Sequence, residues 1–219
     1  MPCGSERIGA FHEENHDTTK LYYTPGACSQ APHITLREAG IDFTWEKVDL
    51  KAKVTESGQD YRQINPKGYV PALEVSPGVV MTELAVLLQY LADRVPERKL
   101  APPPASPERY ELQSWLVFIS TEIHKGFSPM FKPISDDAKE VFKQILATRL
   151  DYVESQLSKR EYLLPSGFSV ADIYLFVTTG WAPRLNIDLS RWPSIVAFRE
   201  RIAQRPAVQA ALKAEGLLN

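Results

Sequence analysis

"TPGACSQAPHITLREAG", residues 24–40, places a cysteine between a Pro-Gly turn and an apolar helical pattern. The residues before it, "KLYYT" (20–24), favour a strand, and Gly40 is typical of the position just after a helix. The stretch therefore predicts a strand, a tight turn and a helix in succession, with Cys28 at the start of the helix. Unpaired amides and the positive end of the helix dipole gather there, so we expect a lowered pKa for the thiol. The alternative is a small buried hydrophobic residue.

The sequence from residue 41 to residue 95 continues this alternation. Strong β formers alternate with polar residues, two β-prone segments flank a Ser-Pro-Gly turn, and one segment has apolar residues at helical spacing. The segments are a strand over 41–50, a short irregular helix over 56–65, strands over 70–75 and 78–82, and a helix over 83–95. The order β-α-β-α-β-β-α predicts an α/β, thioredoxin-like domain over residues 20–94.

Residues 95–107 contain five prolines, which exclude a helix or a strand ladder. We therefore predict an interdomain linker over 95–106. Beyond it the chain has helical patterns only, so residues 107–219 are predicted to form an all-helical domain. Apolar stripes mark helices over 108–127 and 138–157.

Two details of the helical half are expected to recur in the structure. The stripe of the helix over 138–157 includes Val141 and Ile145, which we expect to be buried. A later segment, "FSVADIYLFVTTGW" (168–181), is apolar on nearly all sides, which predicts the central helix of the bundle. Ser169 and Asp172 have the spacing of a capping box at its start.

Composition excludes several classes of protein. The 219 residues are 44% hydrophobic and 24% charged, with a formal net charge of −2, the balance of a soluble globular protein. The mixed charges give no sign of a nucleic-acid or anionic-membrane partner, and no apolar run reaches the ~20 residues of a membrane span. No signal peptide is visible, so we expect a cytoplasmic protein.

Residues 1–19 are polar and aperiodic, which predicts a flexible N-terminal extension. Within them "HEENH" (12–16) formally matches a zinc-protease pattern. That chemistry needs both histidines on one face of a stable helix, and no amphipathic run surrounds the match. We predict no metal site.

Two segments of the first half suit the binding of a peptide. A cis bond at Val70-Pro71 would turn the backbone so that Val70 offers its N–H and C=O to an extended peptide. A plain strand-opening proline is the alternative. Glu83 starts a predicted helix, where its carboxylate can meet an ammonium group while nearby amides bind a carboxylate. An ordinary acidic residue of a first helical turn is the alternative.

The helix over 108–127 has a second face, offset from its apolar stripe. Val117, Thr121, His124 and Lys125 share this face and are expected to look across at the first domain. A histidine near a thiol can hold or relay its proton, whereas a lone helical histidine is otherwise solvated or a packing residue. The motif C-S-Q-A has no second thiol three residues on, so Cys28 needs an external thiol for redox work.

Taken together, these segments resemble the bacterial beta-class glutathione S-transferases. The likeness runs nearly end to end and leaves only the N-terminal extension outside. It includes "KLYYTPGACSQAPHITLREAG" (20–40), "INPKGYVPAL" (64–73), "HKGFSPMF" (124–131), "FSVADIYLF" (168–176) and "RPAVQAAL" (205–212). The resemblance implies a thioredoxin-like domain that binds glutathione, a helical domain that lines a second-substrate pocket and makes dimer contacts, and a homodimer.

The resemblance also implies roles for residues of the first domain. Cys28 matches the cysteine that contacts the glutathione sulfur and can form a mixed disulfide with it. Lys53 matches a lysine near the glycine carboxylate of the tripeptide. Val70 matches the residue whose backbone pairs with the cysteinyl unit, and Pro71 matches the cis proline after it. Glu83 matches the acidic residue that meets the γ-glutamyl end.

His124 and Lys125 match a His-Lys pair close to the thiol. Ser29, at the same helix start as Cys28, joins Cys28 and His124 as a candidate catalytic residue, while Leu84 and Thr121 complete the predicted glutathione site. The candidate walls of the second-substrate pocket are Phe127, Phe131 and Trp181, although each is otherwise a core residue.

Two positions depart from the family pattern. Relatives usually carry glycine where this chain has Leu84, and we expect its branched side chain to crowd the site. Relatives commonly carry asparagine where this chain has Val117, so a polar contact is expected to be lost. Together the two changes predict glutathione binding weakened by about one or two orders of magnitude.

Two classes of function compete. The first is an enzyme that adds the glutathione thiolate to electrophilic hydrophobic substrates, with thiol–disulfide exchange or peroxide reduction through Cys28 as a further activity. The second is a non-catalytic binding or regulatory protein with a weakened glutathione site, supported by Leu84 and Val117. The sequence does not identify the second substrate.

Overall fold

A five-stranded sheet forms the base of the first half of the chain, and the computed structural model describes residues 19–218. The strand order is β3-β2-β1-β4-β5, with β1 parallel to β2 and the other neighbouring pairs antiparallel. The strands are β1 (Thr19–Tyr23), β2 (Phe43–Asp49), β3 (Val54–Thr55), β4 (Ala72–Ser76) and β5 (Val79–Thr82). The predicted mixed, thioredoxin-like sheet is confirmed.

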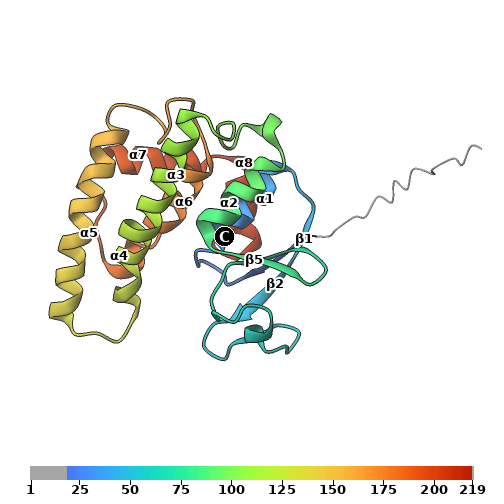
Figure 1. Ribbon diagram of the computed structural model, residues 1–219. Coiled ribbons are helices and arrows are strands. Elements are labelled where there is room, and N and C mark those ends of the chain that lie inside the picture. Colours follow the sequence, from blue (N-terminus) through green and yellow to red (C-terminus); the bar gives the residue numbers. More distant parts are fainter. Residues whose placement is uncertain (1–18, 219) are drawn as a thin grey trace, which may run out of the picture.

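Two helices, α1 (Gln30–Ala39) and α2 (Leu84–Asp93), cover the face of the sheet that looks toward the helical domain (Figure 1). Because side chains alternate along a strand, Leu21 of β1 packs with α1 and α2, while its neighbour Tyr22 packs on the opposite face. That opposite face carries only one turn of 3-10 helix (Tyr61–Gln63) where the sequence predicted a helix. The two-residue strand β3 was not predicted.

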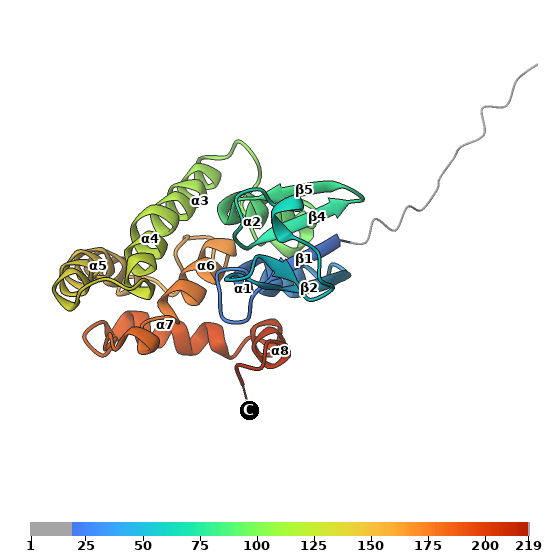
Figure 2. The same ribbon diagram turned by 90° about the horizontal axis from the view of Figure 1, so that it is seen from below.

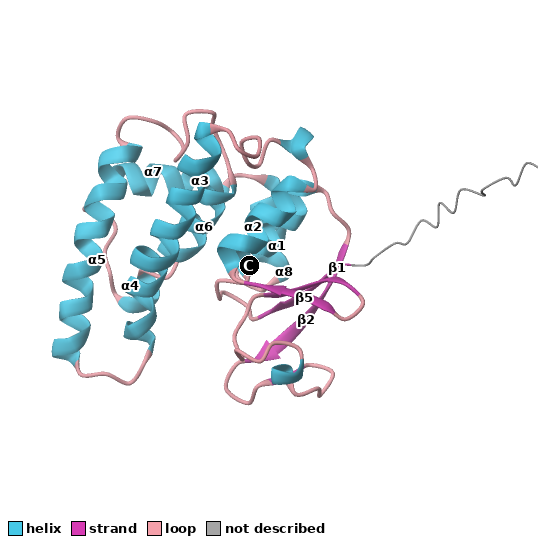
Figure 3. Ribbon diagram, in the orientation of Figure 1, coloured by secondary structure: helices cyan, strands magenta, loops and turns pink. Residues whose placement is uncertain are grey.

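The second half of the chain consists of helices stacked beside α1 and α2 (Figures 2 and 3). They are α3 (Pro107–Phe118), α4 (Lys125–Phe127), α5 (Asp136–Leu157), α6 (Val170–Thr179), α7 (Pro193–Ala203) and α8 (Pro206–Ala214). All ten residues of α6 are buried, as expected of a central helix. Ser169 and Asp172 form the predicted capping box at its start.

Both halves share one apolar core. Side chains of α1 and α2, among them Ile34 and Leu88, pack in the same cluster as those of the helical domain. Across the junction Arg109 of α3 donates two hydrogen bonds to the Asp93 carboxylate, each 2.7 Å long. A turn of 3-10 helix (Pro96–Arg98) lies in the segment predicted as a linker.

The predicted burial of Val141 and Ile145 in α5 is wrong, since they are 55% and 48% exposed. The buried stripe of α5 consists of Leu146, Leu150, Val153 and Leu157. Each residue turns a helix by about 100°, so Ile145 lies well off the stripe that starts at Leu146.

Three further sequence expectations concern the chain as a whole. The "HEENH" segment and the predicted extension up to residue 18 lie outside the described residues, whereas Thr19 belongs to β1. Within residues 19–218 no helix is long and apolar enough to cross a membrane. In the same part of the chain no three His, Cys, Asp or Glu side chains are grouped to hold a metal ion.

Candidate active site

Cys28 lies where the sequence predicted it, in the turn that leads into α1. The turn holds it two residues before the first residue of the helix, and the Cys28 carbonyl accepts a hydrogen bond from the Ala31 amide at 3.1 Å. Its thiol donates a hydrogen bond to the carbonyl of Val70, with Sγ and the oxygen 3.2 Å apart. The thiol therefore meets the backbone of the strand-opening segment across the domain.

The predicted lowering of the Cys28 pKa is wrong for the free protein. Burial raises the pKa of the thiol to about 12 and outweighs the nearby amides and the Lys125 charge, which favour the thiolate. The position of Cys28 at the start of a helix can be read from the sequence, whereas its desolvation depends on the folded structure. Cys28 is therefore a protonated hydrogen-bond donor at neutral pH.

Ser29 is placed differently from its expected catalytic role. Its side chain is fully buried, and its hydroxyl accepts from the Thr24 amide at 3.0 Å and donates to the Thr24 carbonyl at 3.2 Å. Both contacts close the turn on itself. Ser29 thus holds the Cys28 loop, and its catalytic role stays a prediction.

The Val70-Pro71 bond is cis, and Lys53 lies close to the same segment. Lys53 has a left-handed backbone (φ 60°), and its ammonium donates to the Gly68 carbonyl at 2.6 Å. This leaves two of its three N–H donors for other acceptors. Lys53 and the Cys28 thiol thus both contact the backbone of residues 68–70.

Glu83 stands directly before α2 in a left-handed conformation (φ 71°). Such a backbone is costly for a residue with a side chain and tends to persist at functional sites. Its exposed carboxylate accepts from the Tyr69 hydroxyl at 3.0 Å and forms an ion pair with Lys67. The hydrogen bond from Lys67, above all, lowers the pKa of Glu83. Lys67 and Tyr69 were missed, although both stand beside Val70 in "NPKGYV".

A π-helix over Ile119–His124 interrupts the helix that was predicted over 108–127. A π-turn takes in extra residues and changes the phase of the helix, so the predicted common face is divided. Val117 and Thr121 point to solvent, and the Thr121 hydroxyl donates to the Val117 carbonyl at 3.0 Å. His124 instead turns toward Cys28, while Lys125 is exposed with its charge near Cys28 and Glu83.

His124 is held by aromatic neighbours. Its Nδ1 shares a 2.8 Å hydrogen bond with the Tyr174 hydroxyl, and its ring meets Trp181 edge-on with centroids 5.0 Å apart. Burial, helped by the Lys125 charge, lowers the pKa of His124 to about 4. The imidazole is therefore neutral at pH 7. The missed residue Tyr174 sits in the α6 segment that resembled the family, and its position opposite His124 was not readable from spacing.

Cys28 and His124 line one cavity of about 330 Å³ between the domains. Of the predicted walls, Phe131 and Trp181 line it, whereas Phe127 is fully buried behind the Trp181 ring. Its charged lining residues are Lys132 and Arg184, both cations. The lining consists of Thr24, Pro25, Gly26, Ala27, Cys28, Leu50, His124, Ser128, Phe131, Lys132, Trp181 and Arg184.

The two positions that depart from the family pattern lie away from this cavity. Leu84 follows Glu83 in the chain, is 6% exposed and packs in the core shared by the two domains. Val117 is 58% exposed on the outer face of α3. Neither residue lines the cavity of Cys28 and His124, and their effect on glutathione binding stays a prediction.

The fold agrees with comparisons to known proteins. Models of the glutathione S-transferase N-terminal and C-terminal domains match residues 26–94 and 118–206. Glutathione S-transferase GstA of Escherichia coli O157:H7 is 47% identical over 199 residues, which cover 90% of this chain and 99% of that protein.

Two solved structures add to this likeness. The beta-class glutathione S-transferase of Sphingomonas chungbukensis is 48% identical with a TM-score of 0.88. A sphingomonad glutathione S-transferase in complex with glutathione is 47% identical with the same TM-score. In each case the match covers 91% of this chain and 100% of the other. The chain belongs to the glutathione S-transferase family, and its resemblance to the bacterial beta class is confirmed.

Proposed function

We propose that this protein binds glutathione beside Cys28 and transfers the glutathione thiolate to the electrophilic carbon of a small hydrophobic substrate. One observation carries the proposal: Cys28, His124 and the Trp181 ring line a single cavity, and the Cys28 thiol also contacts the Val70 carbonyl. The alternative of a non-catalytic binding protein is not favoured, because similar proteins over nearly the whole chain are glutathione S-transferases.

In this proposal glutathione lies extended along the cis-proline segment. The backbone of Val70 pairs with the cysteinyl unit and brings its sulfur to Cys28. The free N–H donors of Lys53 suit the glycine carboxylate. Glu83 suits the γ-glutamyl ammonium, and the amides at the start of α2 suit the carboxylate next to it.

The chemistry of the bound thiol follows from the charges around it. Lys125 is the nearby cation that favours thiolates, and the protonated Cys28 can donate its S–H to the glutathione sulfur. The thiol proton passes to solvent, because a histidine with a pKa of about 4 is too weak a base to hold it at pH 7. The thiolate then attacks the electrophile, which loses its leaving group or gains a proton.

Thiol–disulfide exchange or peroxide reduction stays a proposed further activity. It requires the Cys28 thiolate, whose formation burial opposes in the free protein. The high pKa therefore favours conjugation as the main activity and makes exchange slow at neutral pH.

Replacing Cys28 by alanine separates the two activities. We expect kcat/KM for conjugation of glutathione to an activated aryl chloride to fall about tenfold, the worth of one hydrogen bond. Exchange with a small disulfide should disappear. Calorimetric titration with glutathione serves as the control for binding. A wild-type protein that does not bind glutathione in this titration would contradict the proposed function.

We also propose a cytoplasmic homodimer. Tyr110 and Val117, seven residues apart on α3, are 62% and 58% exposed, and such side chains are typical of a face that a partner covers. Thr121 lies beside them in the same surface hollow. The free thiol of Cys28 suits a reducing compartment.

A further inference from the structure

The carboxylate of Glu215, just after α8, is buried against the loop that carries Cys28. Its side chain is fully inaccessible to solvent. It accepts three hydrogen bonds, from the Gly26 amide at 2.9 Å, from Gln30 Nε2 at 3.3 Å and from His33 Nδ1 at 2.8 Å. The chain therefore returns from its far end to the start of α1.

The protonation of His33 follows from its second neighbour. Arg37 Nε, which can only donate, lies 2.9 Å from His33 Nε2. His33 Nε2 must therefore accept, and Nδ1 carries the hydrogen that is given to Glu215. Since His33 is fully buried among aromatic rings, this arrangement fixes the Glu215 carboxylate in one orientation.

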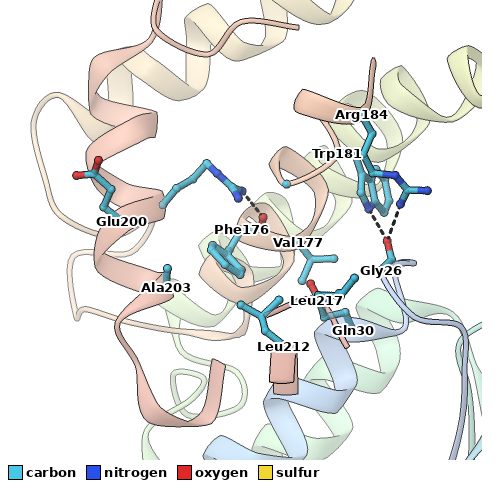
Figure 4. A pocket seen from close by; sticks show the side chains of 12 residues that line it. Gly26, Gln30, Phe176, Val177, Trp181, Arg184, Glu200, Ala203, Leu212 and Leu217 are labelled. Carbon is cyan, nitrogen blue, oxygen red and sulfur yellow. Dashed lines mark hydrogen bonds between the residues drawn. The ribbon is translucent and has the colours of Figure 1, made fainter. Parts of the chain in front are cut away.

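Gly26, two residues before Cys28, is held on both sides by the helical domain. The Gly26 N–H donates a hydrogen bond to the Glu215 carboxylate. The Gly26 carbonyl accepts from Trp181 Nε1 at 3.0 Å and from Arg184 Nη1 at 3.5 Å (Figure 4). Its left-handed backbone (φ 68°) leaves the peptide groups facing these partners. The loop thus depends on donors and acceptors from outside its own domain.

We propose that Glu215 is a positioning residue that fixes the Gly26 peptide and thereby sets the place of the Cys28 thiol. The inference rests on the proposed function only in that Cys28 is the reactive thiol of the site. Pro25, Gly26 and Ala27 line the same cavity as Cys28, so a shift of this loop changes the enclosure of the thiol directly. Without Glu215 the Gly26 N–H has no acceptor, and the loop opens to water to satisfy it.

The test measures how fast iodoacetamide alkylates Cys28 as a function of pH, with peptide mass spectrometry to separate Cys28 from Cys3. In this reaction the thiolate forms an S–C bond and iodide leaves, and no glutathione is needed. We expect the midpoint of the profile to move down by at least about one pH unit in Glu215→Ala, because an opened loop exposes the thiol.

A matched control is available at the other end of α1. Glu38 is also a mostly buried carboxylate that ties α1 to the segment before α8, with bonds of 2.6 and 2.9 Å from Arg205. Glu38→Ala removes this tie without touching the loop, so its alkylation profile should match the wild type even where its melting temperature falls. Glu215→Gln keeps an acceptor for Gly26 and should restore most of the wild-type profile.

Three results would overturn the inference: an unchanged profile in Glu215→Ala, an equal shift in Glu38→Ala, or no difference between Glu215→Gln and Glu215→Ala. If Glu215→Ala does not fold, Glu215→Asp, whose shorter side chain draws the carboxylate away from the Gly26 amide, is compared with Glu38→Asp, with a shift expected in the first only. Failure of the wild type to bind glutathione would reject the proposed function and leave the alkylation result intact.

Discussion

At the scale of single residues, the site works through side chains whose charge state is set by burial. Cys28 is kept as a thiol and His124 as a neutral imidazole, while the exposed Lys125 supplies the positive charge. The nearby cation favours a bound thiolate without needing a charged histidine. Because burial lowers the pKa of His124, the stability of the folded protein depends on pH.

Replacing His124 by phenylalanine should remove part of the acid sensitivity of the fold. The pKa of His124 is about 4 in the folded protein against an ordinary 6.5, so its contribution is present above pH 6.5 and lost as pH falls toward 4. The loss amounts to at most about 3 kcal/mol, from 1.36 kcal/mol per pKa unit. Urea denaturation between pH 7 and 4 measures it.

The difference between wild type and His124→Phe isolates this contribution. It should shrink by the stated amount between pH 7 and 4, because only the wild type must protonate an imidazole on unfolding. A difference that stays constant over this range would mean that His124 is not neutral in the folded protein.

At the scale of elements, the start of α6 is the best-defined local structure. Asp172 accepts from the amides of Leu163 and Ser169, both at 2.8 Å, and from the Ser169 hydroxyl at 3.0 Å. Burial raises the pKa of Asp172 to about 6 against these bonds, so the carboxylate is ionised at pH 7. The central helix therefore depends on one buried carboxylate.

Asp172→Ala should lower the free energy of unfolding by about 2–4 kcal/mol, since it leaves buried amides unsatisfied and removes a helix cap. Asp172→Asn keeps acceptors for part of the network and should cost less. Denaturant unfolding at pH 7 checks both. Ser135→Ala, which removes the exposed cap of α5, serves as a control with a loss of about 1 kcal/mol or less. Equal losses in Asp172→Ala and Ser135→Ala would contradict this account.

Elements also show what the sequence could predict. The Cys28 turn and the capping box were predicted, because each depends on residues that are neighbours in the chain. The residues left the Val70-Pro71 bond open between cis and trans, and only the family resemblance implied the cis form. The π-helix was not predicted, because no local signal marks the extra residue that divides Val117 from His124. The pKa of Cys28 depends on burial by distant segments, and for that reason its direction was predicted wrongly.

At the scale of the whole molecule, the active-site loop joins the two domains. The thiol comes from the first domain, while His124, Trp181 and Glu215 come from the second. Contacts of this kind are invisible to sequence spacing, since Gly26 and Glu215 lie at opposite ends of the described chain. Beyond the single chain, we propose the homodimer described above.

Val117→Asp should convert the proposed homodimer to monomers, because a charge would be buried against an apolar partner face. Light scattering at several protein concentrations measures the mass. Val141→Asp, at an exposed apolar position on α5, tests whether the effect is specific to the α3 face. A wild type that is monomeric at all concentrations would reject the dimer.

The most direct test of the central claim, that Cys28 faces the glutathione sulfur, is intact-protein mass spectrometry after incubation with oxidised glutathione. The Cys28 thiolate attacks one sulfur, forms a mixed disulfide and releases reduced glutathione, which adds ~305 Da. We predict this adduct at Cys28 in the wild type, faster at pH 9 than at pH 7, and its absence at this position in Cys28→Ala. No adduct at Cys28 at either pH, together with no glutathione binding by calorimetry, would contradict the claim.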